Sequence, residues 1–126
     1  MKNVVKLIKT AEQDNKILAV FLFGSAARED GHRQSDVDIC LIMRQDIYSP
    51  VELSRKKLEY LEAFNMDVQI FQQLPLYIRI RVIREGKNLF CSDEDGLYRL
   101  VFNTISAFED FKYIYQDYLK EVESAG

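Results

Sequence analysis

Two apolar runs, Ile17 to Phe23 and Val37 to Met43, place the strongest constraint on the fold of this chain. Short apolar runs bounded by polar residues are typical of buried β-strands. Gly24-Ser25 follows the first run directly, and after ten further residues Asp36-Val37-Asp38 opens the second run. The sequence therefore predicts two strands whose ends carry a small-residue turn and a pair of carboxylates.

The carboxylates of Asp36 and Asp38 are expected to lie on one face of their strand, because side chains at i and i+2 point to the same side. Two such carboxylates repel each other unless a cation lies between them. Mg²⁺ is commonly held by one or two carboxylates together with substrate phosphates. An isolated Asp-x-Asp is more often a solvated strand entry, but here the Gly-Ser turn at the end of the first strand favours a metal site.

Gly24 and Ser25 have the properties of a phosphate-binding turn. Gly24 lacks a Cβ atom, so backbone can come close to a ligand, and Ser25 offers a hydroxyl where a helix is expected to begin. The free N–H groups at a helix N-terminus favour an anion. Gly-Ser alone is usually a simple turn, and its position opposite the carboxylates is what favours nucleotide binding.

These motifs resemble the signature of the DNA polymerase β-type nucleotidyltransferase superfamily, and within it the minimal nucleotidyltransferase (MNT) branch. That branch usually continues Gly-Ser with x-Ala-Arg-Gly and places Ser before its Asp-x-Asp. The residues that match this pattern are Ala27, Arg28 and Ser35, while Glu29 stands where the branch commonly has Gly. The resemblance covers about residues 18–95, including the phrase Ile83 to Phe90.

The superfamily uses a third carboxylate on a later strand, and the segment Met66 to Phe71 resembles that strand. Asp67 is the matching residue. Its alternative role is a strand-edge or turn aspartate after Asn65. The first two carboxylates favour the functional role.

The resemblance implies a Mg²⁺-dependent transfer of a nucleoside monophosphate, AMP from ATP, to a hydroxyl with release of pyrophosphate. Asp36 and Asp38 would hold the metals, and Asp67 would position a metal or receive the hydroxyl proton. Gly24 and Ser25 would seat the β- and γ-phosphates. In such transfers the enzyme aligns the reactants and neutralises charge.

Resemblance to stand-alone MNT proteins also implies a partner, a HEPN-domain toxin that is adenylylated on a tyrosine in a toxin–antitoxin pair. Two alternatives stay open. The chain could be a non-catalytic antitoxin that neutralises its partner by binding, or a small-molecule nucleotidyltransferase.

Length and charge limit the other classes. With 126 residues, the chain is expected to form one nucleotidyltransferase domain, 1–126. Its 17 basic and 20 acidic residues form no block of one sign, so nucleic-acid binding is unsupported. The lysine-interrupted N-terminus is not a signal peptide, and no apolar run is long enough for a membrane span. Two cysteines without metal spacing suit the cytoplasm.

Four helices are expected around a small mixed β-sheet, which gives an α/β (α+β) fold of the polymerase β type. The first follows Val4, Leu7, Ile8 and Ala11, and the second opens with the capping box Ser49-Pro50-Val51-Glu52 and has Leu58, Leu61 and Phe64 inside. Residues 75–85 are predicted helical, followed by a long helix over 94–123 capped by Ser92 or Asp93. That helix either completes the core or uses its distal half as a homo- or hetero-oligomer contact.

Overall fold

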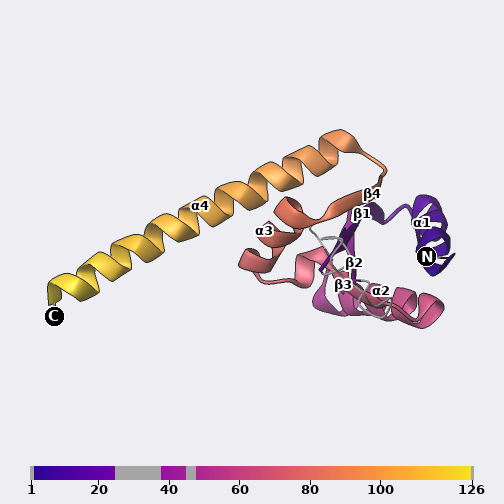
Figure 1. Ribbon diagram of the computed structural model, residues 1–126, viewed down its shortest axis with the longest axis horizontal. Helices are drawn as coiled ribbons and strands as arrows, with labels where there is room; N and C mark the ends of the chain where they lie inside the picture. Colours follow the sequence, from indigo (N-terminus) through magenta and orange to yellow (C-terminus); the bar gives the residue numbers. More distant parts are fainter. Residues whose placement is uncertain (1, 25–37, 45–47, 126) are drawn as a thin grey trace.

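The computed structural model describes residues 2–24, 38–44 and 48–125, and of residues 2, 124 and 125 it describes the backbone alone (Figure 1). The elements, in chain order, are α1 (Lys2–Gln13), β1 (Ile17–Phe23), β2 (Asp38–Met43), α2 (Pro50–Phe64), β3 (Asp67–Ile70), η2 (Phe71–Gln73), α3 (Leu76–Glu85), β4 (Lys87–Cys91) and α4 (Glu94–Ala125). This arrangement confirms the expected α+β class.

The strands form one mixed sheet in the order β3-β2-β1-β4. β1 pairs antiparallel with both β2 and β4, and β2 pairs parallel with β3. The parallel pair is possible because α2 carries the chain back across the sheet between β2 and β3. A shift of register between Ile17 and Ala19 marks a bulge in β1.

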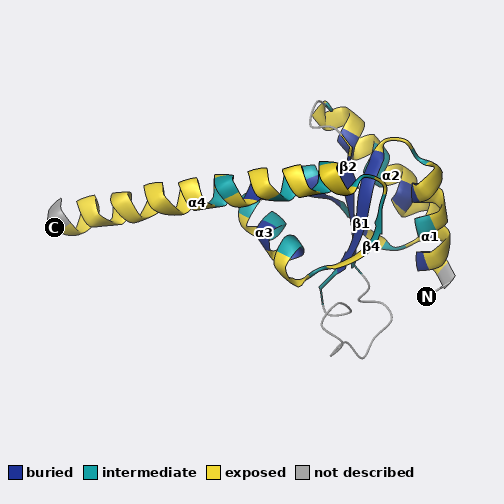
Figure 2. Ribbon diagram, turned by 90° about the horizontal axis from the view of Figure 1, so that it is seen from above, coloured by how far each residue is buried: buried dark blue, intermediate teal, exposed yellow. Residues whose placement is uncertain are grey.

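Both faces of the sheet are covered, which explains why β1 and β2 are apolar on both sides. Ile39, Leu41 and Met43 pack with α1 and α2, while Cys40 and Ile42 pack with α3 and the start of α4. Figure 2 shows the buried strands between these helix layers. The alternation predicted for β2 is therefore confirmed over the strand. Each face of the sheet packs into its own hydrophobic core.

The second helix begins where the sequence predicts. Ser49 and Glu52 form the reciprocal capping box, and Asn65 ends the helix in the left-handed conformation with φ 49°. The predicted inner face was wrong for Leu58 and Leu61, which are 55% and 38% exposed, and right for Phe64, which packs against the core. The buried residues of this helix are Leu53 and Tyr60. The helix face that carries Tyr60 points inward, where the Tyr60 hydroxyl donates a hydrogen bond to Asp14.

The segment after η2 is helical, as predicted, and α3 is followed directly by β4. Gly86 follows α3 with φ −73°, so it does not use the left-handed freedom of glycine. A Cβ there would lie 3.1 Å from Phe21 Cδ2 and 3.2 Å from the Leu22 carbonyl oxygen, so Gly86 is required for close approach to β1. The sequence analysis did not identify β4.

The last helix, α4, runs from Glu94 to Ala125, two residues beyond the predicted end, and projects away from the sheet (Figure 1). Asp93 caps it, since its Oδ1 accepts a hydrogen bond from the Gly96 backbone. Figure 2 shows that burial along α4 stops partway, and every side chain described from residue 109 onward is exposed. The core interpretation is therefore wrong for the distal half. In the part of the chain that the structure describes, no helix is long and apolar enough to cross a membrane.

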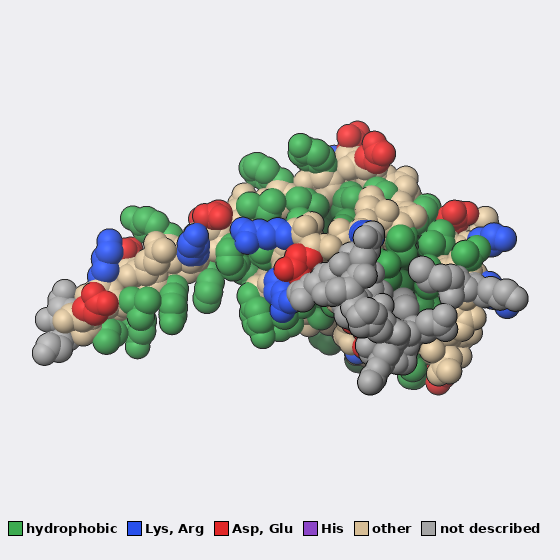
Figure 3. All heavy atoms as spheres, viewed as in Figure 1, with side chains coloured by type: hydrophobic (Ala, Val, Ile, Leu, Met, Phe, Trp, Pro, Cys, Tyr) green, Lys and Arg blue, Asp and Glu red, His purple; other side chains and the backbone are tan. Residues whose placement is uncertain are grey.

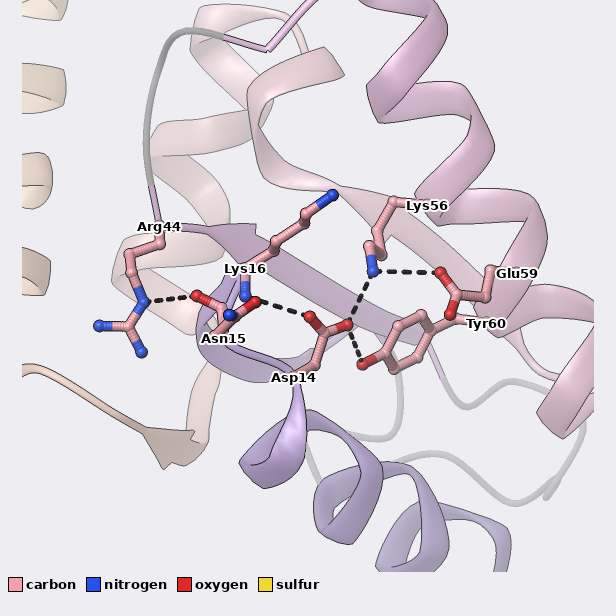
Figure 4. A network of polar contacts seen from close by, with 7 residues as sticks. All are labelled: Asp14, Asn15, Lys16, Arg44, Lys56, Glu59 and Tyr60. Carbon is pink, nitrogen blue, oxygen red and sulfur yellow. Dashed lines mark hydrogen bonds and ion pairs between the residues drawn. The ribbon is translucent and has the colours of Figure 1, made fainter.

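A half-buried polar cluster joins the segment after α1 to α2 at the end of the sheet where β1 begins (Figure 4). The Asp14 carboxylate accepts hydrogen bonds from Lys56 Nζ at 2.8 Å and from the Tyr60 hydroxyl at 3.0 Å. Burial raises the pKa of Asp14, but Lys56, the Lys16 backbone and Tyr60 outweigh it and hold the pKa below its ordinary value of 3.8.

The change Asp14→Asn is expected to lower the free energy of unfolding by about 1–2 kcal/mol at neutral pH, because a charge-assisted contact is lost. Since the Asp14 pKa is lower in the folded chain, the ionised carboxylate stabilises the fold above the unfolded pKa. This contribution is lost as the pH falls through the folded pKa, so urea unfolding should show the difference between wild type and variant vanishing in acid. The exposed partner offers a control: Glu59→Gln should cost less than about 0.5 kcal/mol. An equal pH dependence in wild type and Asp14→Asn would contradict the assignment.

Candidate active site

Three of the residues singled out in the sequence meet at one end of the sheet. Asp38 opens β2 and pairs with Phe23, the last residue of β1, so Gly24 lies beside it. Asp67 opens β3 and is the register partner of Asp38 across the parallel pair. The fold therefore brings together a turn and two carboxylates that are distant in the sequence.

The Asp38 and Asp67 side chains belong to the same face, because register partners on neighbouring strands point to the same side of a sheet. Strands lie about 4.8 Å apart, and like charges at facing positions are destabilising. Asp38 is half-buried and Asp67 is exposed. Two facing carboxylates that bring a stability cost are the arrangement that a bound cation would relieve.

The Gly24 backbone is shaped around the Asp38 carboxylate. Gly24 has φ +84°, a conformation that L side chains rarely adopt. A Cβ atom at this position would collide with Asp38 Oδ2 and would lie 3.3 Å from Asp38 Cγ. The absence of a side chain at Gly24 thus leaves the space that this carboxylate occupies.

Asp67 is held from the side by Gln69 and α2. Gln69 Nε2 donates a hydrogen bond to Asp67 Oδ1 at 3.3 Å. Lys57 Nζ in turn donates to Gln69 Oε1 at 3.2 Å. This chain of two bonds fixes one oxygen of the Asp67 carboxylate and ties it to a cation on α2.

The remaining predicted site residues, Ser25 and Asp36, lie outside the described residues. Among those described, no group of three potential metal-ligating side chains comes together, so Asp38 and Asp67 supply two carboxylates of the expected set. Carboxylate oxygens on adjacent strands are the donor chemistry that Mg²⁺ prefers. The residues present therefore fit a magnesium ion.

Residues 5–95 match the family of polymerase beta nucleotidyltransferases, which is more than half of the chain. The chain belongs to this family. The match includes Gly24, Asp38 and Asp67, and with them the end of the sheet where these residues meet.

A relative of this nucleotidyltransferase is a candidate protein adenylyltransferase of Methanocaldococcus jannaschii, 32% identical over 77 residues. The match covers 60% of this chain and 57% of that protein, so the chain spans little more than half the length of the relative.

Solved structures share the fold over nearly the whole chain. A toxin–antitoxin structure with AMP-PNP contains a chain with TM-score 0.67 at 21% identity, covering 96% of each chain. A chain in the complex of a tri-AMPylated Shewanella oneidensis HEPN toxin with its MNT antitoxin gives TM-score 0.63 at 20% identity, covering 96% of this chain and 93% of the other. These matches establish the expected polymerase β-type fold of this nucleotidyltransferase.

The sequence analysis missed Gln69 and Lys57. A signal for Gln69 was present, since it lies two residues after Asp67 on the same strand face. Lys57 could not be found in this way, because its contact depends on how α2 packs against β3.

Proposed function

We propose that this chain is a Mg²⁺-dependent nucleotidyltransferase that transfers AMP from ATP to a hydroxyl group. The observation that carries the proposal is the register pairing of Asp38 with Asp67 beside the positive-φ Gly24, within a nucleotidyltransferase family match. A glycine turn packed against the Asp38 carboxylate and two carboxylates on one face support this proposal, because an in-line phosphoryl displacement needs alignment and charge neutralisation.

The chemistry follows from this placement. The acceptor hydroxyl oxygen forms a bond to the α-phosphorus of ATP as the bond to the bridging oxygen breaks, and pyrophosphate leaves. Asp67 lies exposed at the open end of β3, where it can receive the hydroxyl proton, and Gln69 keeps its carboxylate oriented. Gly24 and Ser25 seat the β- and γ-phosphates. Asp38 lies between this turn and Asp67.

Asp36, Asp38 and Asp67 would hold Mg²⁺, which when bound neutralises the negative charge on the phosphates. Two carboxylates alone repel a triphosphate, so the same residues that form the site also make it dependent on a divalent cation. The proposed setting is the cytoplasm, which keeps thiols such as Cys40 and Cys91 reduced.

The proposed acceptor is a tyrosine of a HEPN-domain toxin, so that the chain acts as the antitoxin of a toxin–antitoxin pair. The name of the archaeal relative as a candidate protein adenylyltransferase supports a protein acceptor. The similar fold found in toxin–antitoxin structures, one with AMP-PNP and one with an AMPylated HEPN toxin, supports the identity of the partner.

Incubation of the chain with a purified HEPN-domain protein and ATP labelled at its α-phosphate tests this proposal. Label is expected on a tyrosine of the partner, together with release of pyrophosphate, and omission of Mg²⁺ should abolish both. Stable binding without label would identify a non-catalytic antitoxin. Label on an aminoglycoside in preference to the partner would identify a small-molecule nucleotidyltransferase.

A further inference from the structure

The distal half of α4 carries an apolar surface that the described part of the chain leaves uncovered. Phe111, Tyr115, Tyr118, Leu119 and Val122, called here the distal stripe, are between 41% and 59% exposed. They recur at spacings of three, four and seven residues along the helix, so they share one face. Figure 3 shows hydrophobic side chains side by side along one edge of the projecting helix.

The distal stripe continues the face by which α4 packs on its own domain. Thr104 is buried and Leu97 packs against the core, and they precede Phe111 by seven and fourteen residues. The same face is thus buried near β1 and exposed beyond residue 108. A continuous packing face that outruns its own domain is suited to a second protein surface.

A hollow marks the point where α4 leaves the domain. It has a volume of about 220 Å³ and is lined by Leu76, Tyr77, Phe108 and Phe111. Apolar hollows of this kind receive the bulky anchor side chains that dominate binding energy in protein interfaces. The hollow and the distal stripe meet at Phe111 and form one surface.

The area of this surface suits a stable complex. Aromatic side chains bury roughly 150–250 Å² each, so the five partly exposed aromatics of this surface offer on the order of 400–600 Å², and its leucines and valine add to that area. A standard interface takes about 800 Å² from each partner.

The residue types favour a different protein over a second copy of this chain. A two-stranded helical pair prefers Ile, Val and Leu along its seam, whereas the distal stripe places Phe111, Tyr115 and Tyr118 there. Large aromatics with a polar tip are enriched at interfaces with other proteins.

The charge of the segment points the same way. Residues 109–123 contain five acidic residues and two lysines, so two copies would bring like net charge together. A partner with basic residues beside an apolar groove complements this segment.

We infer that the distal stripe and its hollow are the docking surface for the acceptor protein, which presents an apolar groove with Lys or Arg at its rim. The identity of the docked protein as the acceptor rests on the proposed function. The surface lies on α4 and the start of α3, whereas the candidate active site lies on β1, β2 and β3, so docking and nucleotide binding are separable.

The test compares two double variants of the full chain, with the HEPN-domain protein as the probe. Tyr115→Asp with Leu119→Asp changes the distal stripe and is expected to weaken binding at least about 100-fold. Phe102→Asp with Tyr113→Asp is the matched control, since both are exposed and lie on the opposite face, and binding should be unchanged. ATP affinity and helix content should match wild type in both.

Binding that survives Tyr115→Asp with Leu119→Asp would overturn the docking surface, while label transfer in the same sample would leave the proposed function standing. If the double variant loses binding and wild type binds the partner but transfers no label, the proposed function is refuted and the docking surface stands. If the aspartate variant fails to fold, Tyr118→Ser tests the same face.

Two further measurements test the occupant of the surface. Rising salt should weaken the complex with the HEPN-domain protein. A concentration-dependent dimer of the chain alone that is lost in the variant would assign the surface to a second copy.

Discussion

Asp38→Asn together with Asp67→Asn is expected to abolish Mg²⁺-dependent AMP transfer, by on the order of a thousand-fold or more, while the fold remains intact. Both side chains keep their shape but lose the charge that holds the cation. Because the two carboxylates are register partners, neutralising them also removes a like-charge repulsion, which offsets the contacts that the two carboxylates lose. The thermal midpoint should therefore stay close to that of wild type. Transfer of label from ATP and thermal unfolding measure the two effects.

Loss of activity with retained stability separates this site from an ordinary strand entry. Solvated strand-end aspartates could be replaced with little effect on either quantity. The control neutralises two exposed carboxylates on α1 and α2, Glu12→Gln with Glu62→Gln, and should retain full transfer. Wild-type rates in the double Asp variant would remove Asp38 and Asp67 from the mechanism.

Much of the fold was predictable because it is encoded locally. The apolar runs of β1 and β2 are recognisable in isolation, and the capping box at Ser49 fixes the start of α2 through contacts within four residues. Strand β4 was missed because it is short, polar at its start and only partly buried. Its extended shape comes from pairing with β1, a contact that no local pattern records.

The candidate site was predictable as a set of residues but not as an arrangement. The apolar run after Asp38 and the family resemblance of the segment around Asp67 indicated that both are strand-borne, yet their facing register depends on how α2 returns the chain across the sheet. The inner face of α2 was wrong for a related reason. Leu58 is more apolar than Tyr60, but the hydroxyl of Tyr60 donates a hydrogen bond to Asp14, which follows α1. The sequence of α2 alone does not indicate that partner.

Gly24→Ala is expected to weaken ATP binding far more than the loss of a single hydrogen bond would, because the new Cβ collides with Asp38 Oδ2. The backbone adds to the effect, since φ +84° is a conformation that costs an L residue roughly 1–2 kcal/mol. Gly24→Val should exclude the nucleotide altogether, whereas Ser25→Ala should cost about 1.5–3 kcal/mol, the worth of one hydrogen bond to a charged group. Calorimetric titration with ATP and Mg²⁺ measures all three.

The collision itself can be isolated with a second substitution. In Gly24→Ala with Asp38→Ala the atoms that collide are gone, so the fold should regain part of the stability lost in Gly24→Ala while nucleotide binding stays weak. Residues in direct contact give coupling energies of about 0.5–3 kcal/mol in such a cycle. Gly96→Ala is the control, because its Cβ would meet the Asp93 carboxylate at 2.7 Å in a helical cap away from the site. Stability losses that simply add would contradict the collision between Gly24→Ala and Asp38. Unchanged ATP affinity in Gly24→Val would show that this turn does not seat the phosphates.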